Sequence, residues 1–459
     1  MVVTSSDRAR SRTAIVLPDE AAWLVWGHDL AAVGIDRVAS PERADVLLTP
    51  ARVPDALLPA IREAWDRMGP TRAHEVLAAP TAGSSVADAL HGAEDEPGGH
   101  GSHEAHGHGT HAGHDEHAGH DMHGGHDEHA GHDMHSGHDM MAIVGDPSAD
   151  GLVMEDIAFT LGPLAPSLPG GLVVDLSLDG DVVAAAAVRA TLAADAADPA
   201  AGVLPDPLAV HAWQAAFAAS DPVRSDPVRS LTSVELERAL SHAAWLRTLA
   251  SALGWAQLGD AALALARALL AVRRAAEGRA ATRGLGEPLD AASLRLADVR
   301  KLVASRRFGR RLSDDGRLDP DELLRRGVGG PVARAAGIET DARDGDERYR
   351  LLGFERQVAR DGDAAARARV RTQEIGESLR LVAAVVANPA RIESAAVAPI
   401  VEGPRGPLRV DDHGGGAHAS APGARELTEL AGAAMLDLEL ASATAVLVSF
   451  DLSPWRVGA

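Results

Sequence analysis

The chain has 459 residues, of which 46% are apolar and 3% aromatic, and its formal charge is −22 with the histidines counted as neutral. This length suffices for two or three domains with a sizeable core, and so acidic a chain is not expected to bind nucleic acid nonspecifically, because that requires a basic surface. Cysteine is absent, which excludes disulfides, thiolate nucleophiles, iron–sulfur clusters and thiolate-bound nickel, so any metal must be bound by histidine, carboxylate, methionine or backbone oxygen.

Residues 1–80 are predicted to form a small α/β unit. Residues 44–49 are a short apolar run suited to a buried strand, and residues 54–68 place apolar side chains at helical spacing. A short helix is expected within residues 23–34, before that strand.

The composition changes over residues 81–148, where Gly, His, Asp and Glu replace most of the apolar residues. The stretch from His91 to His138 holds 15 of the 21 histidines, and the unit GHDEHAGHDMH occurs at 113–123 and again at 125–135. With so little apolar content, this stretch cannot offset the entropy of folding. We therefore predict a linker that is disordered in the absence of metal.

Residues 149–459 are predicted to form a mainly helical domain with a small antiparallel β element. Alternating apolar residues over 172–183 predict a hairpin with Asp179-Gly180 at its turn, whereas residues 184–194 look more helical than extended. Helical periodicity covers residues 233–254, 259–283, 290–304, 319–326, 363–387 and 424–447. Glu235 falls in the opening turns of the first of these, where a carboxylate favours the helix dipole. The predicted fold class is α+β, mainly α.

Seven separated segments within residues 152–456 carry sequence motifs in a fixed order. They are Gly162-Pro163 through Leu172 (GPLAPSLPGGL); Glu237-Arg238 with Ser241-His242; Ser305 to Phe308 with Arg311; Gly327 through Gly330-Pro331 with Arg334, Gly337, Asp341 and Arg343; Gly362-Asp363 with Arg367, Arg371 and Glu374; Val401 to Gly406, including Glu402 and Arg405; and Asp437 to Asp451.

These segments resemble motifs of the quinone-site subunit (49-kilodalton, or D) of NADH-quinone oxidoreductase, complex I. That family also includes the large subunits of NiFe hydrogenases. The resemblance implies the helical domain of this family, with its small antiparallel β element. More faintly, residues 44–68 resemble the strand–helix segment of the neighbouring 20-kilodalton (B) subunit.

The charged residues of these motifs allow two interpretations. The residues able to make bidentate, charge-assisted pairs are Arg334, Arg343, Arg367, Arg371 and Glu374. They either join helices to one another, which we favour, or bind a ligand. His242 is likewise either a buried histidine that bonds a neighbouring carbonyl, or a catalytic or ligand-binding residue.

The residues that carry the chemistry of this family are missing. Two histidines of its GPxHPxxHG motif line the quinone headgroup site, where a polar donor suits quinone reduction. The matching positions here are Ala165 and Pro169, and Tyr349 lies too late in the chain to replace the tyrosine of that site. The paired CxxC motifs of the hydrogenases are also absent. We therefore assign no catalytic or cofactor-binding residue, expect no covalently bound cofactor, and find the sequence unfavourable to a bound quinone.

The histidine-rich tract is predicted to bind divalent nickel, copper or zinc, for which imidazole is a suitable ligand. A glycine-rich chain can wrap around an ion without preformed geometry. The predicted ligands are His100, His103, His106, His108, His111, His114, His117, His120, His123, His126, His129, His132, His135 and His138. The alternative is a solubilising linker whose repeats have expanded.

The resemblance implies a non-catalytic or partner-dependent subunit of an electron-transfer complex like NADH-quinone oxidoreductase or a hydrogenase. The alternative is a nickel- or copper-handling or assembly protein that uses the scaffold to recognise partners. Expected partners are other subunits of such a complex and transition-metal ions, with no nucleic acid and with membrane contact only through partner subunits. No apolar run reaches the length of about 18 residues that a transmembrane helix needs, and the N-terminal apolar stretch is too short for a signal peptide. We expect a cytoplasmic protein, peripheral at the inner face of the cell membrane.

Overall fold

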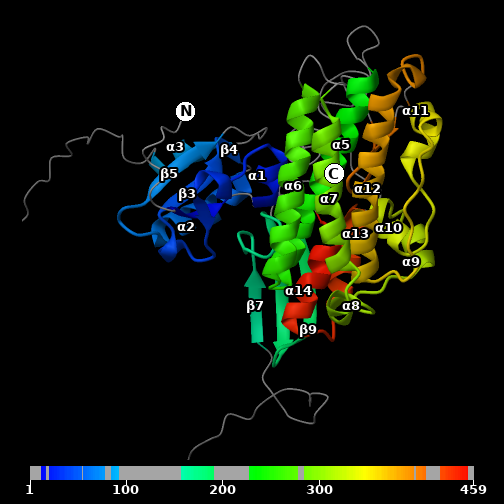
Figure 1. Cartoon of the computed structure of the whole chain (residues 1–459). Coiled ribbons are helices and arrows are strands. Elements are labelled where there is room, and N and C mark those ends of the chain that lie inside the picture. The colour runs from blue at the N-terminus through cyan, green and yellow to red at the C-terminus, as the bar shows by residue number, and fades with distance from the viewer. Residues whose placement is uncertain are drawn as a thin grey trace, which may run out of the picture.

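The computed structural model describes residues 12–16, 20–53, 55–77, 84–91, 157–190, 227–277, 284–396, 398, 400–409 and 424–452. They form a small α/β unit and a larger, mainly helical part with an antiparallel sheet, which confirms the predicted fold class (Figure 1). None of the described helices is both long enough and apolar enough to cross a membrane.

The N-terminal unit is built on a four-stranded parallel sheet in the order β2-β1-β3-β5. Its elements are β1 (Arg12–Val16), α1 (Glu20–Val25), η1 (Ala31–Val33), β2 (Ile35–Arg37), η2 (Pro41–Arg43), β3 (Val46–Pro50), η3 (Asp55–Leu57), α2 (Leu58–Arg67), β5 (Ala73–Leu77) and α3 (Val86–His91), with β4 (Arg52–Val53) and β6 (Ser84–Ser85) as a short antiparallel pair. Every residue of β3 is buried, as expected for an apolar run in the interior of a parallel sheet.

The unit extends beyond its predicted end at residue 80. Val86 of α3 is fully buried, in the same apolar cluster as Leu57 and Met68. Burial of this side chain holds α3, which follows residue 80, against the unit.

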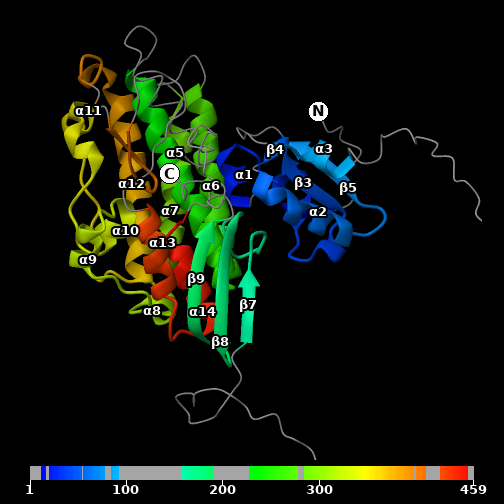
Figure 2. The same ribbon diagram turned by 180° about the vertical axis from the view of Figure 1, so that it is seen from behind.

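Helix α1 joins the unit to the rest of the chain. Its residues Ala21, Leu24 and Val25 are buried in the large apolar core, where α1 packs against α5 (Pro227–Ala252). Just beyond α1, Asp29 accepts two hydrogen bonds from Arg267 of α6 (Ala256–Glu277), at 2.5 and 2.9 Å. The unit therefore lies against one side of the helices, as both views show (Figures 1 and 2).

The antiparallel sheet has three strands, β7 (Ile157–Leu161), β8 (Leu172–Asp179) and β9 (Val182–Ala190). The β8–β9 hairpin turns at Gly180, whose φ is +64°, as predicted. The helical prediction for residues 184–194 is wrong up to Ala190, because β9 pairs with β8 as far as the Leu172–Ala190 pair. Strand pairing here overrides the helix propensity of four successive alanines.

Four long helices form the bundle beside this sheet: α5, α6, α7 (Gly286–Val303) and α12 (Ala364–Ala387). Helix α5 packs against both α6 and α12, and α7 packs against the same two helices. The shorter elements are α8 (Arg306–Leu312), α9 (Pro320–Arg325), α10 (Gly330–Ala335), η5 (Ala342–Gly345), α11 (Glu347–Leu351) and η6 (Pro389–Arg391). These helices confirm the mainly helical prediction.

The C-terminal part consists of the hairpin β10 (Ile400–Gly403) and β11 (Gly406–Arg409), then α13 (Ala424–Ala433) and α14 (Leu440–Ser449). A single helix over residues 424–447 is therefore wrong. Between the two helices, the Asp437 N–H donates to the Val183 carbonyl and the Val183 N–H donates to the Leu438 carbonyl, and Asp437 has a φ of +61°. The tip of the β8–β9 hairpin thus takes the backbone bonds that would continue the helix (Figure 2).

Candidate functional site

A buried network of arginines and carboxylates joins α5, α10, η5, α12 and the β10–β11 hairpin. Its members are Glu235, Arg238, His242, Arg334, Asp341, Arg343, Glu374 and Glu402, each at most 9% exposed. Charges removed from water to this extent persist only when they are paired and hydrogen-bonded. The sequence segments that supply them lie far apart, so the fold itself assembles the network.

Arg334 of α10 is at the centre. Its Nε and Nη2 donate to Glu374 Oε1 at 2.9 and 2.6 Å, and its Nη1 donates to Glu402 Oε1 at 2.8 Å. The same Nη1 lies 3.1 Å from Asp341 Oδ2. Burial alone would lower the pKa of Arg334, but Glu374, Glu402 and Asp341 outweigh it and hold the pKa above its ordinary value. One guanidinium therefore ties α10 to α12, to η5 and to the hairpin.

His242 of α5 bonds to the other side of Glu374, with 2.9 Å between Nε2 and Oε2. Burial lowers the pKa of His242, although Glu374 opposes the shift. A neutral ring that donates from Nε2 to the carboxylate fits these contacts. Burial would raise the pKa of Glu374, but Arg334 and the bond from His242 hold it well below its ordinary value. The histidine is buried as in the first interpretation, but its partner is a carboxylate rather than a carbonyl.

Glu235 is a member of the network that the motifs do not indicate. It accepts hydrogen bonds from Arg238 Nη2 at 3.1 Å, the Tyr349 hydroxyl at 2.5 Å and Ser378 Oγ at 2.7 Å. The expected helix starts at residue 233, whereas α5 begins at Pro227 and buries Glu235 well inside it. The spacing of residues 235, 238 and 242 on one helix face is the signal that could have found it.

A second cluster connects α12 to the end of the chain. Arg371 and Arg405 donate to the two carboxylate oxygens of Asp451, at 3.3 and 3.0 Å, and Arg367 Nε donates to Ser449 Oγ at 2.9 Å. Burial, together with the neighbouring Arg371, lowers the pKa of Arg367 to about 9. Asp363 caps α12 by accepting from the Ala366 N–H at 2.7 Å. The charged motif residues thus contact one another across elements, as in the helix-joining interpretation.

Two motif glycines lie where backbones approach closely. A Cβ on Gly330, which has a φ of +71°, would be 2.4 Å from the Arg405 carbonyl oxygen; one on Gly162, with a φ of +101°, would be 2.0 Å from that of Leu172. Pro331 follows in the buried first turn of α10, and the Pro163 carbonyl accepts from the Gly171 N–H at 2.8 Å. Gly330 therefore allows α10 to lie close to the β10–β11 turn, and Gly162 allows the loop before β8 to lie close to Leu172.

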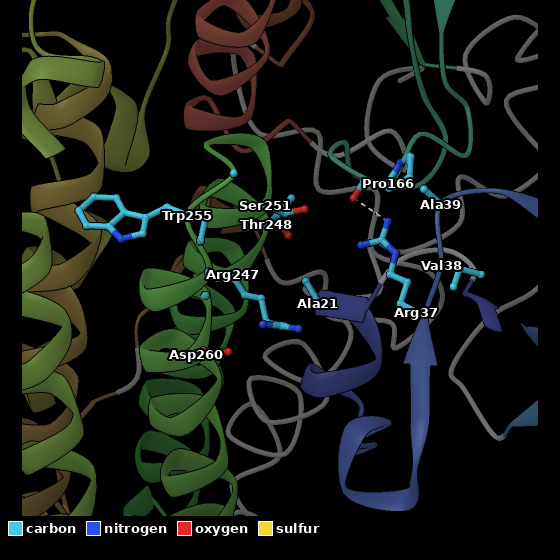
Figure 3. A pocket seen from close by; sticks show the side chains of 14 residues that line it. Ala21, Arg37, Val38, Ala39, Pro166, Arg247, Thr248, Ser251, Trp255 and Asp260 are labelled. Carbon is cyan, nitrogen blue, oxygen red and sulfur yellow. Dashed lines mark hydrogen bonds between the residues drawn. The ribbon is translucent and has the colours of Figure 1, made fainter. Parts of the chain in front are cut away.

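That loop borders a cavity between the N-terminal unit and the bundle (Figure 3). The cavity has a volume of about 500 Å³ and its polar lining comes from Arg37, Arg247, Thr248, Ser251 and Asp260. Pro166 also lines it, and its carbonyl accepts from Arg37 Nη2 at 2.6 Å. Neither of the positions that match the quinone-site histidines is a described lining residue.

Those two positions have structural roles. Ala165 packs against the main apolar core, and the Pro169 carbonyl accepts from the Leu172 N–H at 3.1 Å. Tyr349 is 3% exposed and its hydroxyl donates to Glu235, so it contacts the buried network.

The predicted metal ligands from His100 to His138 lie outside the described residues. Within the part of the chain that the structure describes, no group of three or more His, Cys, Asp or Glu side chains could hold a metal ion. The metal prediction therefore depends on the sequence of the tract.

Comparison with known proteins identifies a family for part of the C-terminal region. Residues 279–404, which run from before α7 into the β10–β11 hairpin, match the family described as "Respiratory-chain NADH dehydrogenase, 49 Kd subunit". The C-terminal region contains a domain of this family. The matched range includes Arg334, Arg343, Glu374 and Glu402, so much of the buried network belongs to this domain.

Individual relatives agree with the match to the 49-kilodalton family. The chain is 32% identical over 119 residues to the D-type subunit of NADH-quinone oxidoreductase from Granulibacter bethesdensis, covering 25% of this chain and 26% of the relative. It is 38% identical over 77 residues to the H-type subunit of NAD(P)H-quinone oxidoreductase from Thermosynechococcus vestitus, covering 16% and 20% of the two chains. The matches thus span about a quarter or less of the length of these relatives.

A solved structure shares the fold over a longer range. It is a chain of the membrane-bound sulfane sulfur reductase, an archaeal respiratory membrane complex, with a TM-score of 0.54 and 18% sequence identity. The superposition covers 66% of this chain and 98% of that one. At this identity the likeness concerns the fold alone.

Proposed function

We propose that this chain is a partner-dependent subunit, without a redox centre of its own, of an electron-transfer assembly related to NADH-quinone oxidoreductase or the hydrogenases. The domain of the 49-kilodalton family supports this role. Each carboxylate of the buried network is engaged by at least one arginine, so the network is a scaffold rather than a set of free acids and bases. One observation carries the proposal. The chain has this buried network of paired charges, but it has Ala165 and Pro169 at the positions of the quinone-site histidines and no cysteine at all.

In this proposal, electrons pass through clusters or cofactors held by other subunits. The chain supplies a rigid helical body on which those subunits assemble at the inner face of the membrane, where the partners contact the bilayer. The N-terminal unit, with its faint likeness to the 20-kilodalton subunit, packs against this helical body through α1 and the Asp29–Arg267 bonds.

A second function is supported by the histidine tract. From its fourteen predicted ligands between His100 and His138 we propose that the tract binds divalent nickel, copper or zinc. If this binding is the main role, the chain is a metal-handling or assembly protein and the scaffold serves to recognise partners.

Purification of the tagged full-length chain from native membranes, in a mild detergent, separates the two functions. The subunit role predicts co-purification, in constant proportion, of subunits with cluster-binding cysteines, together with iron in the eluate. The untagged strain, treated in the same way, is the control. Co-purification of nickel or copper transport and maturation proteins, without iron, would instead establish the metal-handling role and overturn the first proposal.

A further inference from the structure

A basic surface covers the end of α7 and the whole of α8. Its members are Arg300, Lys301, Arg306, Arg307, Arg310 and Arg311, all exposed. The thirteen residues from 300 to 312 contain these six cations and no acidic residue, in a chain whose formal charge is −22. Positive charge is therefore concentrated where the overall balance would not predict it. Figure 1 shows α8 at the lower end of the helical bundle.

The charges of this surface are not neutralised by the surrounding structure. Among the described residues, no carboxylate lies within ion-pair distance of the four arginines of α8, and Lys301 has only Asp298, at 3.9 Å. Arg307 lies over the ring of Trp255, 4.7 Å from its centroid, and Arg311 donates to the Leu253 carbonyl. Two arginines of another helix, α9, differ: the exposed Arg325 and the partly buried Arg326 both contact Glu322.

The packing of α8 against the core leaves these charged side chains exposed. Phe308 and Leu312 are fully buried and hold one face of the helix against the core. Ser305 caps the helix by accepting from the Phe308 N–H at 3.2 Å. The pairs 306/310 and 307/311 recur at i and i+4 on the exposed side. The helix is thus fixed by its apolar face and presents guanidinium groups to the solvent.

We propose that the basic surface of α7 and α8 binds the anionic phospholipid headgroups of a membrane and so gives the chain a direct contact with the bilayer. Basic residues at an anionic surface are attracted by charge alone. The negative charge elsewhere on the chain is screened beyond about 10 Å at 0.1 M salt, so the attraction also orients the molecule. This inference goes beyond the proposed function, in which partner subunits make the membrane contact, and it does not depend on it.

The observations favour lipid over an acidic protein as the ligand. Cores of protein interfaces are depleted in charge and enriched in aromatic side chains. None of the exposed large hydrophobic side chains among the described residues falls within 300–312. The surface offers a partner only cations, which suits a layer of headgroups better than the packed core of a protein interface.

Co-sedimentation of the purified full-length chain with lipid vesicles tests this proposal. The unmodified chain should bind vesicles containing phosphatidylglycerol, should not bind vesicles of phosphatidylcholine alone, and should lose binding as salt is raised. The double variant Arg306→Gln/Arg310→Gln should weaken binding by about tenfold or more. These two side chains make no hydrogen bond or ion pair with a described residue, so the variant should keep the fold, which circular dichroism checks.

A matched control removes the same number of positive charges elsewhere. Arg350→Gln/Arg360→Gln, outside the basic surface and likewise exposed, should leave vesicle binding unchanged. Equal loss in both double variants would show that only net charge matters and would overturn the proposal. Equal binding to neutral and anionic vesicles would also overturn the proposal, as would absence of binding by the folded unmodified chain. A third contradicting result is an α8 variant that still binds vesicles fully but loses a protein subunit from the native assembly.

Discussion

Glu374 shows how a single residue organises the centre of the molecule. It lies on α12, is fully buried, and receives bonds from Arg334 of α10 and His242 of α5. Breaking a buried pair by removing one partner leaves an uncompensated charge, which is far more harmful than losing a pair on the surface. The motif residues of this domain are therefore expected to matter first for the fold.

Replacing Glu374 with Gln tests this expectation. Arg334 would keep Glu402 and Asp341 but lose its shortest ion pair. We expect the free energy of unfolding to fall by about 3–5 kcal/mol, as measured by urea denaturation. The control is Glu287→Gln at an exposed position on α7, with an expected change within about 0.5 kcal/mol. Similar values for the two variants would show that the network does not hold the domain together.

The pH dependence of stability should contain a contribution from His242. Burial lowers its pKa in the folded protein below the ordinary value of 6.5, so as pH falls the unfolded chain takes up the proton first. Between pH 6.5 and the folded pKa the unfolded state binds more protons, and the free energy of unfolding should decrease as pH falls through this range.

His242→Gln should flatten this decrease, because glutamine does not titrate. Denaturation curves at a series of pH values give the slope for the unmodified chain, for this variant and for Glu287→Gln, which should behave like the unmodified chain. An unchanged slope in His242→Gln would mean that the residue is not held neutral in the folded state.

At the scale of elements, the local sequence predicts those helices and turns whose stabilising contacts are made between residues close together in the chain. Helical periodicity predicts a helix over 363–387, and α12 is found at Ala364–Ala387, because Asp363 caps it. Alternation and an Asp-Gly turn likewise predict the β8–β9 hairpin. In each case the deciding contacts lie within a few residues of one another along the chain.

The errors occur where a distant segment decides the outcome. Residues 184–190 are alanine-rich but extended, because β8 pairs with them. The predicted helix over 424–447 is interrupted because the hairpin at Val183 takes its backbone bonds. Motifs indicate most residues of the candidate site but not Glu235, because its partners Tyr349 and Ser378 come from distant parts of the chain. The only local signal for it is its spacing to Arg238 and His242 on one helix face.

The approach of α10 to the β10–β11 turn gives a prediction at this scale. Gly330→Ala should be strongly destabilising, because the backbone there has a φ of +71° and the new Cβ would meet the Arg405 carbonyl at 2.4 Å. Gly327→Ala is the matched control, with a φ of +66° and no atom within 4 Å, so it should lose only the conformational term of about 1–2 kcal/mol. Thermal unfolding measures both, and equal losses would rule out a role for the close contact.

At the scale of the whole molecule, the chain combines a docked α/β unit, a long histidine-rich segment and a helical domain. The histidine tract is predicted to bind several divalent ions without contributing to the folded core, since its glycine content and lack of apolar residues support neither a stable helix nor a core. The tract should therefore act independently of the buried network.

Deleting residues 100–138 should abolish most nickel, copper or zinc binding while leaving the melting transition of the helical domain nearly unchanged. Ligation needs neutral imidazole, so binding by the full-length chain should weaken as pH falls through about 6.5. Isothermal titration calorimetry gives the stoichiometry for both chains. Undiminished stoichiometry after the deletion would place the metal site elsewhere in the chain.

The central claim is that the chain is a scaffold whose redox function depends on its partners. The most direct test is to measure NADH- and hydrogen-dependent quinone reduction by the purified, cofactor-free chain and by the assembly isolated with it from native membranes. We predict no turnover by the chain alone, and turnover in the assembly that follows its iron content. Robust quinone reduction by the isolated chain would contradict this account.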